Sequence, residues 1–90
     1  DMHTASLFPG ADRLDEALSA SAPLLLPMRA EAAGEPRVTL TAPVLKAAFN
    51  IHVLITGDEK RAALERALTL SPKDAPVRAI LDNATVHWAE

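Results

Sequence analysis

The chain has 90 residues, of which 49% are hydrophobic, 23% charged and 3% aromatic, with a formal net charge of −3. This length allows one domain at most, and a mildly acidic chain with so few aromatic side chains lacks the basic surface and stacking platforms of a nucleic-acid binder. No apolar run reaches the roughly 20 residues that cross a bilayer, and the absence of cysteine fits a reducing compartment, so we expect a cytoplasmic protein without nucleic-acid or membrane partners.

The first half of the chain predicts short elements separated by proline-containing loops. A helix is expected over 12–20, with Asp12 as its N-cap. Its apolar face consists of Leu14, Ala17 and Leu18. The apolar run 24–26 is too short for a helix, so we expect a strand there, at a sheet edge where Pro27 need not donate a hydrogen bond. After a polar loop, residues 37–41 alternate with period two, which predicts a second strand.

A helix and a buried strand are predicted next. Pro43 suits the first turn of a helix, and Asn50 suits its end. The apolar face of this helix consists of Val44, Leu45, Ala48 and Phe49. Residues 51–56 form a nearly continuous apolar run rich in β-branched side chains, which indicates a strand buried on both faces, as in a parallel sheet.

The last third of the chain predicts two helices and a final strand. Thr56 and Glu59 match a capping box, so a helix should begin there and run to about Leu70. Its inward residues are expected to be Leu64, Ala67 and Leu68. A short helix is expected over 76–81 and a strand over 84–89. This order of helices and strands, joined by short loops, favours a layered α/β fold.

The first ten residues carry the most specific motif of the chain. The run from Asp1 to Gly10, DMHTASLFPG, resembles the D-x-H-T-A-S-L-F-P-G signature of 6-phosphogluconolactonases, and segments 37–43 and 55–60 are similar to later parts of the same family. Met2 stands where that family usually has glycine, so the backbone there must accommodate a side chain. The resemblance implies that residues 1–90 are the C-terminal portion of a single domain with a Rossmann-like layered α/β fold and a mostly parallel sheet, whose upstream half is missing.

The resemblance also implies an activity, the hydrolysis of 6-phospho-D-glucono-1,5-lactone to 6-phospho-D-gluconate in the oxidative pentose phosphate pathway, with no metal and no organic cofactor. The residues give independent support. The imidazole of His3 titrates near neutral pH and suits a base that activates water. In an extended segment Asp1 projects to the same side and can hold one imidazole nitrogen protonated. By spacing alone, His3 would more often be an exposed histidine near a ragged terminus.

Two basic residues are candidates for binding the substrate phosphate. Lys60 falls in the first turn of a predicted helix, where the helix dipole disfavours a cation unless an anion binds nearby. Arg37 opens a strand, and a guanidinium makes bidentate contacts with phosphate. The resemblance implies this role for both. The alternatives are a surface Lys60 paired with Asp58 or Glu59, and a solvated Arg37 at a strand edge.

The remaining histidines, the tryptophan and two alternative functions also have to be considered. His52 and His87 are 35 positions apart without metal-ligand spacing and are expected to be packed or edge histidines, so no metal site is predicted; Trp88 is expected in the core. A glucosamine-6-phosphate isomerase/deaminase shares the D-x-H motif but continues with I-A-F-N-E-P, whereas this chain reads TASLFP and lacks the glutamate. A non-catalytic sugar-phosphate-binding module is the remaining alternative.

Overall fold

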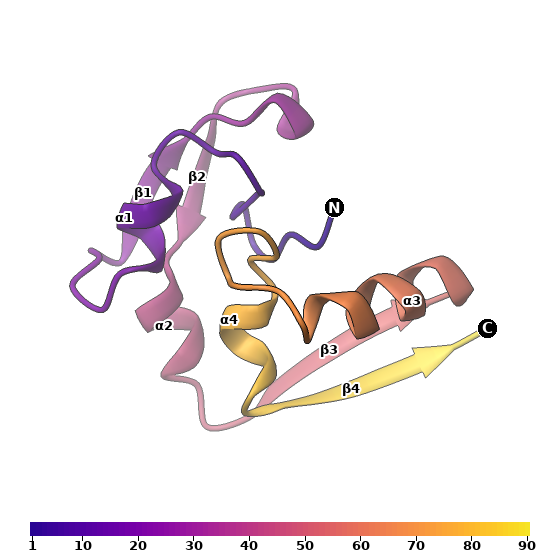
Figure 1. Ribbon diagram of the computed structural model, residues 1–90. Coiled ribbons are helices and arrows are strands. Elements are labelled where there is room, and N and C mark those ends of the chain that lie inside the picture. Colours follow the sequence, from indigo (N-terminus) through magenta and orange to yellow (C-terminus); the bar gives the residue numbers. More distant parts are fainter.

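Two separate two-stranded sheets organise the chain in the computed structural model, which describes residues 1–90 (Figure 1). β1 (Leu25–Met28) pairs antiparallel with β2 (Arg37–Leu40), and β3 (Ile51–Thr56) pairs in parallel with β4 (Ala84–Ala89). All four predicted strands are present, and the α/β class is confirmed. The predicted parallel pairing is confirmed for β3 and β4, whereas the other pair is antiparallel. Pro27 lies within β1, and each strand of a two-stranded sheet has a free edge that tolerates it.

The helices are short; one precedes the first strand, and the others lie between strands in the sequence. In the first half they are α1 (Leu14–Leu18) and α2 (Ala42–Lys46), with a single 3₁₀ turn at Glu31–Ala33. In the second half, α3 (Asp58–Ala67) and α4 (Arg78–Leu81) form the crossover between β3 and β4. A crossover of this kind is what a parallel pair requires, because its two strands start at the same end of the sheet. No helix has the length and apolar character needed to cross a membrane.

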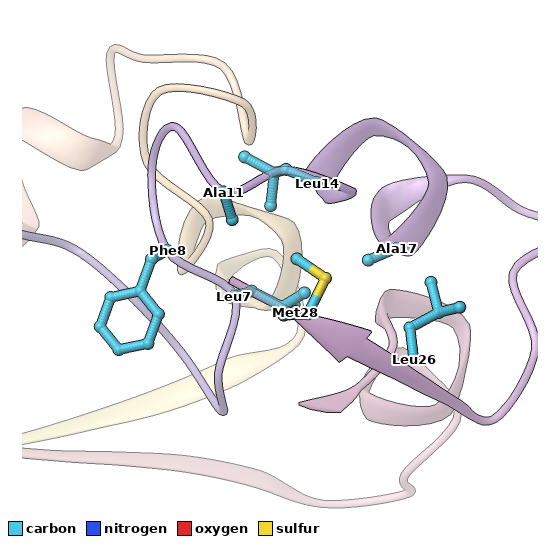
Figure 2. Packing of buried hydrophobic residues seen from close by; sticks show 7 residues of the cluster. All are labelled: Leu7, Phe8, Ala11, Leu14, Ala17, Leu26 and Met28. Atoms are coloured by element: carbon cyan, nitrogen blue, oxygen red, sulfur yellow. The ribbon is translucent and has the colours of Figure 1, made fainter. Parts of the chain in front are cut away.

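Two small hydrophobic clusters hold these elements together. The first joins the N-terminal segment, α1 and β1, and Figure 2 shows its members, Leu7, Phe8, Ala11, Leu14, Ala17, Leu26 and Met28. The second lies between the end of α3 and α4 and consists of Ala67, Ala75, Val77 and Ile80. Met2 and the β3 residues Ile51 and Val53 pack against this second cluster. The N-terminal segment therefore contacts both clusters.

Helix ends account for most of the wrong predictions. Asp12 does not cap α1; its carboxylate accepts a hydrogen bond from the Arg29 amide at 2.9 Å and so ties the loop to the end of β1. The capping box at Thr56 is absent because Gly57, with φ +87°, takes the N-cap position while Thr56 remains paired in β3. α2 ends at Lys46, so Ala48 and Phe49 lie beyond the helix and Phe49 is fully exposed.

The predicted burial of both faces of β3 is also wrong. Alternate residues of β3 are half-buried and exposed, and the Leu54 side chain is 76% exposed. Helices cover only one face of the pair, where Val53 lies opposite Val86 and Ile55 opposite Trp88. Trp88 is half-buried rather than in the core, and its indole N–H donates to the Gly57 carbonyl at 2.8 Å. In α3, Ala67 is buried as predicted and Leu64 half-buried, whereas Leu68 is 55% exposed, because the helix ends at Ala67.

Candidate functional site

The N-terminal motif is folded by its own backbone and anchored to α4. Thr4 and Leu7 exchange backbone hydrogen bonds of 3.4 and 2.9 Å, which close a tight turn after His3. The Met2 carbonyl accepts from the Val77 amide at 3.0 Å. Met2 has φ +63° and Ala5 has φ +50°, a left-handed conformation that is unfavourable by about 1–2 kcal/mol for residues other than glycine. Met2 therefore occupies the family's glycine position with a glycine-like backbone, held there by its contacts with the second cluster.

Asp1 and His3 are brought together by the left-handed conformation of Met2 between them, and not by the extended segment that was predicted. His3 Nδ1 lies 2.6 Å from Asp1 Oδ1, and the same oxygen accepts from the His3 backbone N–H at 3.1 Å. A carboxylate has no proton to donate, so His3 Nδ1 is the donor in this bond. The proton on Nδ1 leaves Nε2 with a free lone pair, as a general base requires.

The surroundings of His3 favour its neutral form. Burial lowers the pKa of His3 below 6.5, and the positive charges of Arg37 and Lys60 lower it further. The Asp1 carboxylate favours the charged form and acts in the opposite direction, since it lies 2.6 Å away. The side chain of His3 is 45% exposed, so water reaches the ring. The net lowering of the pKa keeps His3 neutral at pH 7 and able to accept a proton.

Phe8 is a part of the site that the sequence reading missed. Its ring stacks on the His3 imidazole with 4.4 Å between centroids and 15° between planes, and the Arg37 guanidinium carbon lies 5.6 Å from its centroid. A second link joins the motif to β2, because the buried Thr39 hydroxyl accepts from the Ser6 amide at 3.1 Å. The available signal was an aromatic residue within the motif, five positions after the histidine.

A cavity of about 370 Å³ lies beside His3. Its polar wall includes Asp1, His3 and Lys60, and its apolar wall includes Leu64 of α3 and Ile80 of α4. The structure therefore brings three of the four predicted site residues to one cavity. Its size lies within the range of small-molecule sites.

The two candidate phosphate ligands have different surroundings. Lys60 makes no ion pair within 4 Å, so the alternative in which Asp58 or Glu59 neutralises it is not observed. Arg37 is outside the cavity lining and pairs loosely with Glu35 at 3.8 Å. Both nevertheless lie close enough to His3 for their charges to act on its pKa.

The two remaining histidines meet on the uncovered face of β3 and β4. His52 Nδ1 lies 2.9 Å from His87 Nε2, and both side chains are exposed. Of the two alternatives predicted for them, packed or edge histidines, the structure shows the second, because each strand of this two-stranded sheet has a free edge. The parallel register places His52 opposite Thr85 and Leu54 opposite His87, so the two rings are diagonal neighbours. No group of three or more side chains is placed to hold a metal ion.

Comparisons with known proteins agree with one another. A family model described as glucosamine-6-phosphate isomerases/6-phosphogluconolactonase matches residues 1–88. Proteins named 6-phosphogluconolactonase from Mesorhizobium japonicum and Rhizobium meliloti are 47% and 40% identical over 99% of this chain. A crystal structure of a 6-phosphogluconolactonase from Shewanella baltica matches all of it with a TM-score of 0.92 at 27% identity. The chain covers 39%, 41% and 40% of these three proteins, respectively, and so spans about two fifths of their length.

Proposed function

The chain belongs to the glucosamine-6-phosphate isomerase/6-phosphogluconolactonase family, and on that ground we propose that it carries the catalytic base of a 6-phosphogluconolactonase. The proposed reaction is the hydrolysis of 6-phospho-D-glucono-1,5-lactone to 6-phospho-D-gluconate in the oxidative pentose phosphate pathway, in the cytoplasm. Relatives at 40–47% identity bear the name of that enzyme. The single observation that carries the proposal is the Asp1–His3 hydrogen bond at the edge of a cavity that also contains Lys60.

In the proposed mechanism His3 acts as general base. Its Nε2 accepts a proton from water as the water oxygen bonds to the lactone carbonyl carbon. The tetrahedral intermediate then breaks the bond between that carbon and the ring oxygen, which takes the proton back from Nε2. The product acid releases a proton at neutral pH, and His3 returns to its neutral form. Asp1 holds Nδ1–H throughout and stabilises the transient imidazolium.

Lys60 and Arg37 are proposed to bind the substrate phosphate. An unpaired ammonium in the first turn of α3 is free to meet an anion, and the helix N-terminus adds its own positive potential. The loose Glu35 contact leaves the guanidinium of Arg37 able to exchange a carboxylate for a phosphate. The apolar wall of the cavity that contains Lys60 excludes water from one side of the sugar ring.

We also propose that residues 1–90 are the C-terminal portion of one Rossmann-like domain. The chain's share of its relatives, about two fifths, supports this. The uncovered face of β3 and β4, with Leu54 exposed, further supports additional chain packing there in the complete domain. In that case the natural-length protein is the species to assay.

The proposed function is tested by comparing substrates with purified protein at its natural length. We expect hydrolysis of the phosphorylated lactone well above its spontaneous rate, and little ammonia from glucosamine 6-phosphate. Ammonia release without lactone hydrolysis would assign the deaminase activity instead. Binding of 6-phosphogluconate without any acceleration of hydrolysis would indicate a non-catalytic binding module.

A further inference from the structure

Phe8 contacts both the candidate base and a candidate phosphate ligand, although its side chain has no polar atom. The ring stacks on His3 at 4.4 Å, and the Arg37 guanidinium carbon lies 5.6 Å from its centroid. Only 6% of Phe8 is exposed. Phe8 does not line the cavity itself, so it contacts these two residues from outside the cavity wall.

The Phe8 ring is held by the hydrophobic core rather than by the site. Leu7, its neighbour in the chain, is fully buried in the first cluster, and the Phe8 carbonyl accepts from the Ala11 amide at 3.1 Å. Figure 2 shows the ring at the margin of the cluster, pointing away from Leu7 and Met28. Phe8 therefore presents an apolar ring, anchored in the core, to groups outside it.

This arrangement supplies a constraint on His3 that Asp1 cannot supply. The hydrogen bond to Asp1 fixes the position of His3 Nδ1, but a single bond leaves the ring free to turn about its axis. Stacking at 15° fixes the plane of the ring, so the two contacts together set the direction of the Nε2 lone pair. The same ring also stabilises the position of the Arg37 guanidinium through a cation–π contact.

We propose that Phe8 is the positioning residue of this site, which sets the plane of the His3 imidazole and the place of the Arg37 guanidinium and so fixes the spacing between base and phosphate ligand. The role assigned to it rests on the proposed lactonase function. The contacts themselves do not, and they can be tested without measuring activity.

The first test is spectroscopic and begins with the natural-length protein without substitution. Stacking predicts that the His3 ring protons resonate upfield of their usual positions, because they lie over the Phe8 ring. Phe8→Met, which keeps most of the apolar volume, should abolish that displacement, because a thioether has no ring to stack on the imidazole. Phe8→Tyr should retain the displacement, because it keeps an aromatic ring at this position. The matched control is Leu26→Val in the same cluster, which should leave the displacement unchanged.

Unshifted His3 protons in the unsubstituted protein would overturn the proposal outright. An equal loss of the displacement in Leu26→Val would also overturn it, because the effect would then report core packing alone.

The second test is kinetic. Phe8→Met should lower kcat for the phosphorylated lactone by about 10- to 100-fold, because a misplacement of about 1 Å is expected to cost up to about 10²-fold. It should raise KM by only about two- to fivefold, from the lost cation–π contact with Arg37. Phe8→Tyr should restore kcat, and Leu26→Val should leave it unchanged. Lost stacking with unaltered kcat would refute the positioning role, whereas intact stacking in a protein without lactonase activity would refute only the proposed function.

Discussion

The hydrogen bonds of Asp1 lead us to expect a smaller loss of kcat in Asp1→Asn than is usual for such a pair. In a hydrogen-bonded Asp–His pair, Asp→Asn is often severe because the amide turns its NH₂ toward the ring and inverts the tautomer, with losses of about 10⁴-fold in kcat. Here one oxygen, Asp1 Oδ1, serves two donors, His3 Nδ1–H and the His3 backbone N–H. The backbone N–H cannot be inverted, so in Asp1→Asn the amide oxygen should stay toward His3 and preserve the correct tautomer.

The loss in Asp1→Asn is then the difference between a charge-assisted and a neutral hydrogen bond. That difference is about 1–1.5 kcal/mol, or about 5- to 13-fold in kcat. Both side chains are nearly half exposed, and water weakens their interaction, so we expect a loss at the lower end of this range. Asp1→Ala removes the acceptor altogether and should cost about 10²-fold or more. The pKa of His3 should fall further in both variants, because the carboxylate that favours imidazolium is lost.

Initial rates of lactone hydrolysis, followed by acid release and corrected for spontaneous hydrolysis, measure both variants. Nitrogen NMR of the His3 ring reports the tautomer in the same proteins. A loss in Asp1→Asn as large as in Asp1→Ala, together with the proton on Nε2, would refute the reasoning from the shared oxygen. A preserved tautomer with a modest loss would support it.

Three further predictions concern phosphate, pH and the isolated chain. Lys60→Ala and Arg37→Ala should each weaken binding of 6-phosphogluconate by about 1.5–3 kcal/mol but leave hydrolysis of unphosphorylated glucono-1,5-lactone nearly unchanged; equal losses on both ligands would assign them structural roles. The fall of kcat/KM on acidification should have its midpoint below pH 6.5, because His3 must be neutral to act as base and its pKa is lowered; a midpoint above pH 7 would contradict this expectation. Because of the same lowered pKa, the folded state binds fewer protons than the unfolded chain at acidic pH, so the free energy of unfolding should also fall on acidification. Residues 1–90 expressed alone should not hydrolyse the lactone, whereas a chimera in which they replace the matching segment of the Mesorhizobium japonicum relative should be active; an inactive but folded chimera would count against the proposed site.

The sequence was most informative where a pattern depends on neighbouring residues. The final strand was predicted with the bounds 84–89 that the structure has, and the D-x-H spacing predicted the contact between Asp1 and His3. It was least informative at helix ends, where several local patterns compete. Thr56 matched a capping box, but pairing with Ala89 keeps it in β3 and leaves Gly57 to begin the helix.

Contacts between distant segments could not be predicted from local patterns. His52 and His87 meet only because of the register between β3 and β4, which no spacing in the sequence encodes. Phe8 is an apolar residue of the kind expected in a core, and it is buried there. Its ring also stacks on His3 from the margin of the cluster, which its residue type does not predict. Burial of both faces of β3 was inferred from its apolar run, whereas in this chain the outer face has nothing packed on it.

The central claim is that His3 is the base of a lactone-hydrolysing site, and the most direct measurement is the turnover of 6-phosphogluconolactone by natural-length protein with and without His3→Ala. His3 is nearly half exposed and its ring contacts the core through Phe8 at the margin of the first cluster, so the substitution should change the unfolding transition only slightly. We expect kcat to fall by about 10²–10⁴-fold, the contribution of a general base. A folded His3→Ala protein that retains near wild-type turnover would contradict the account.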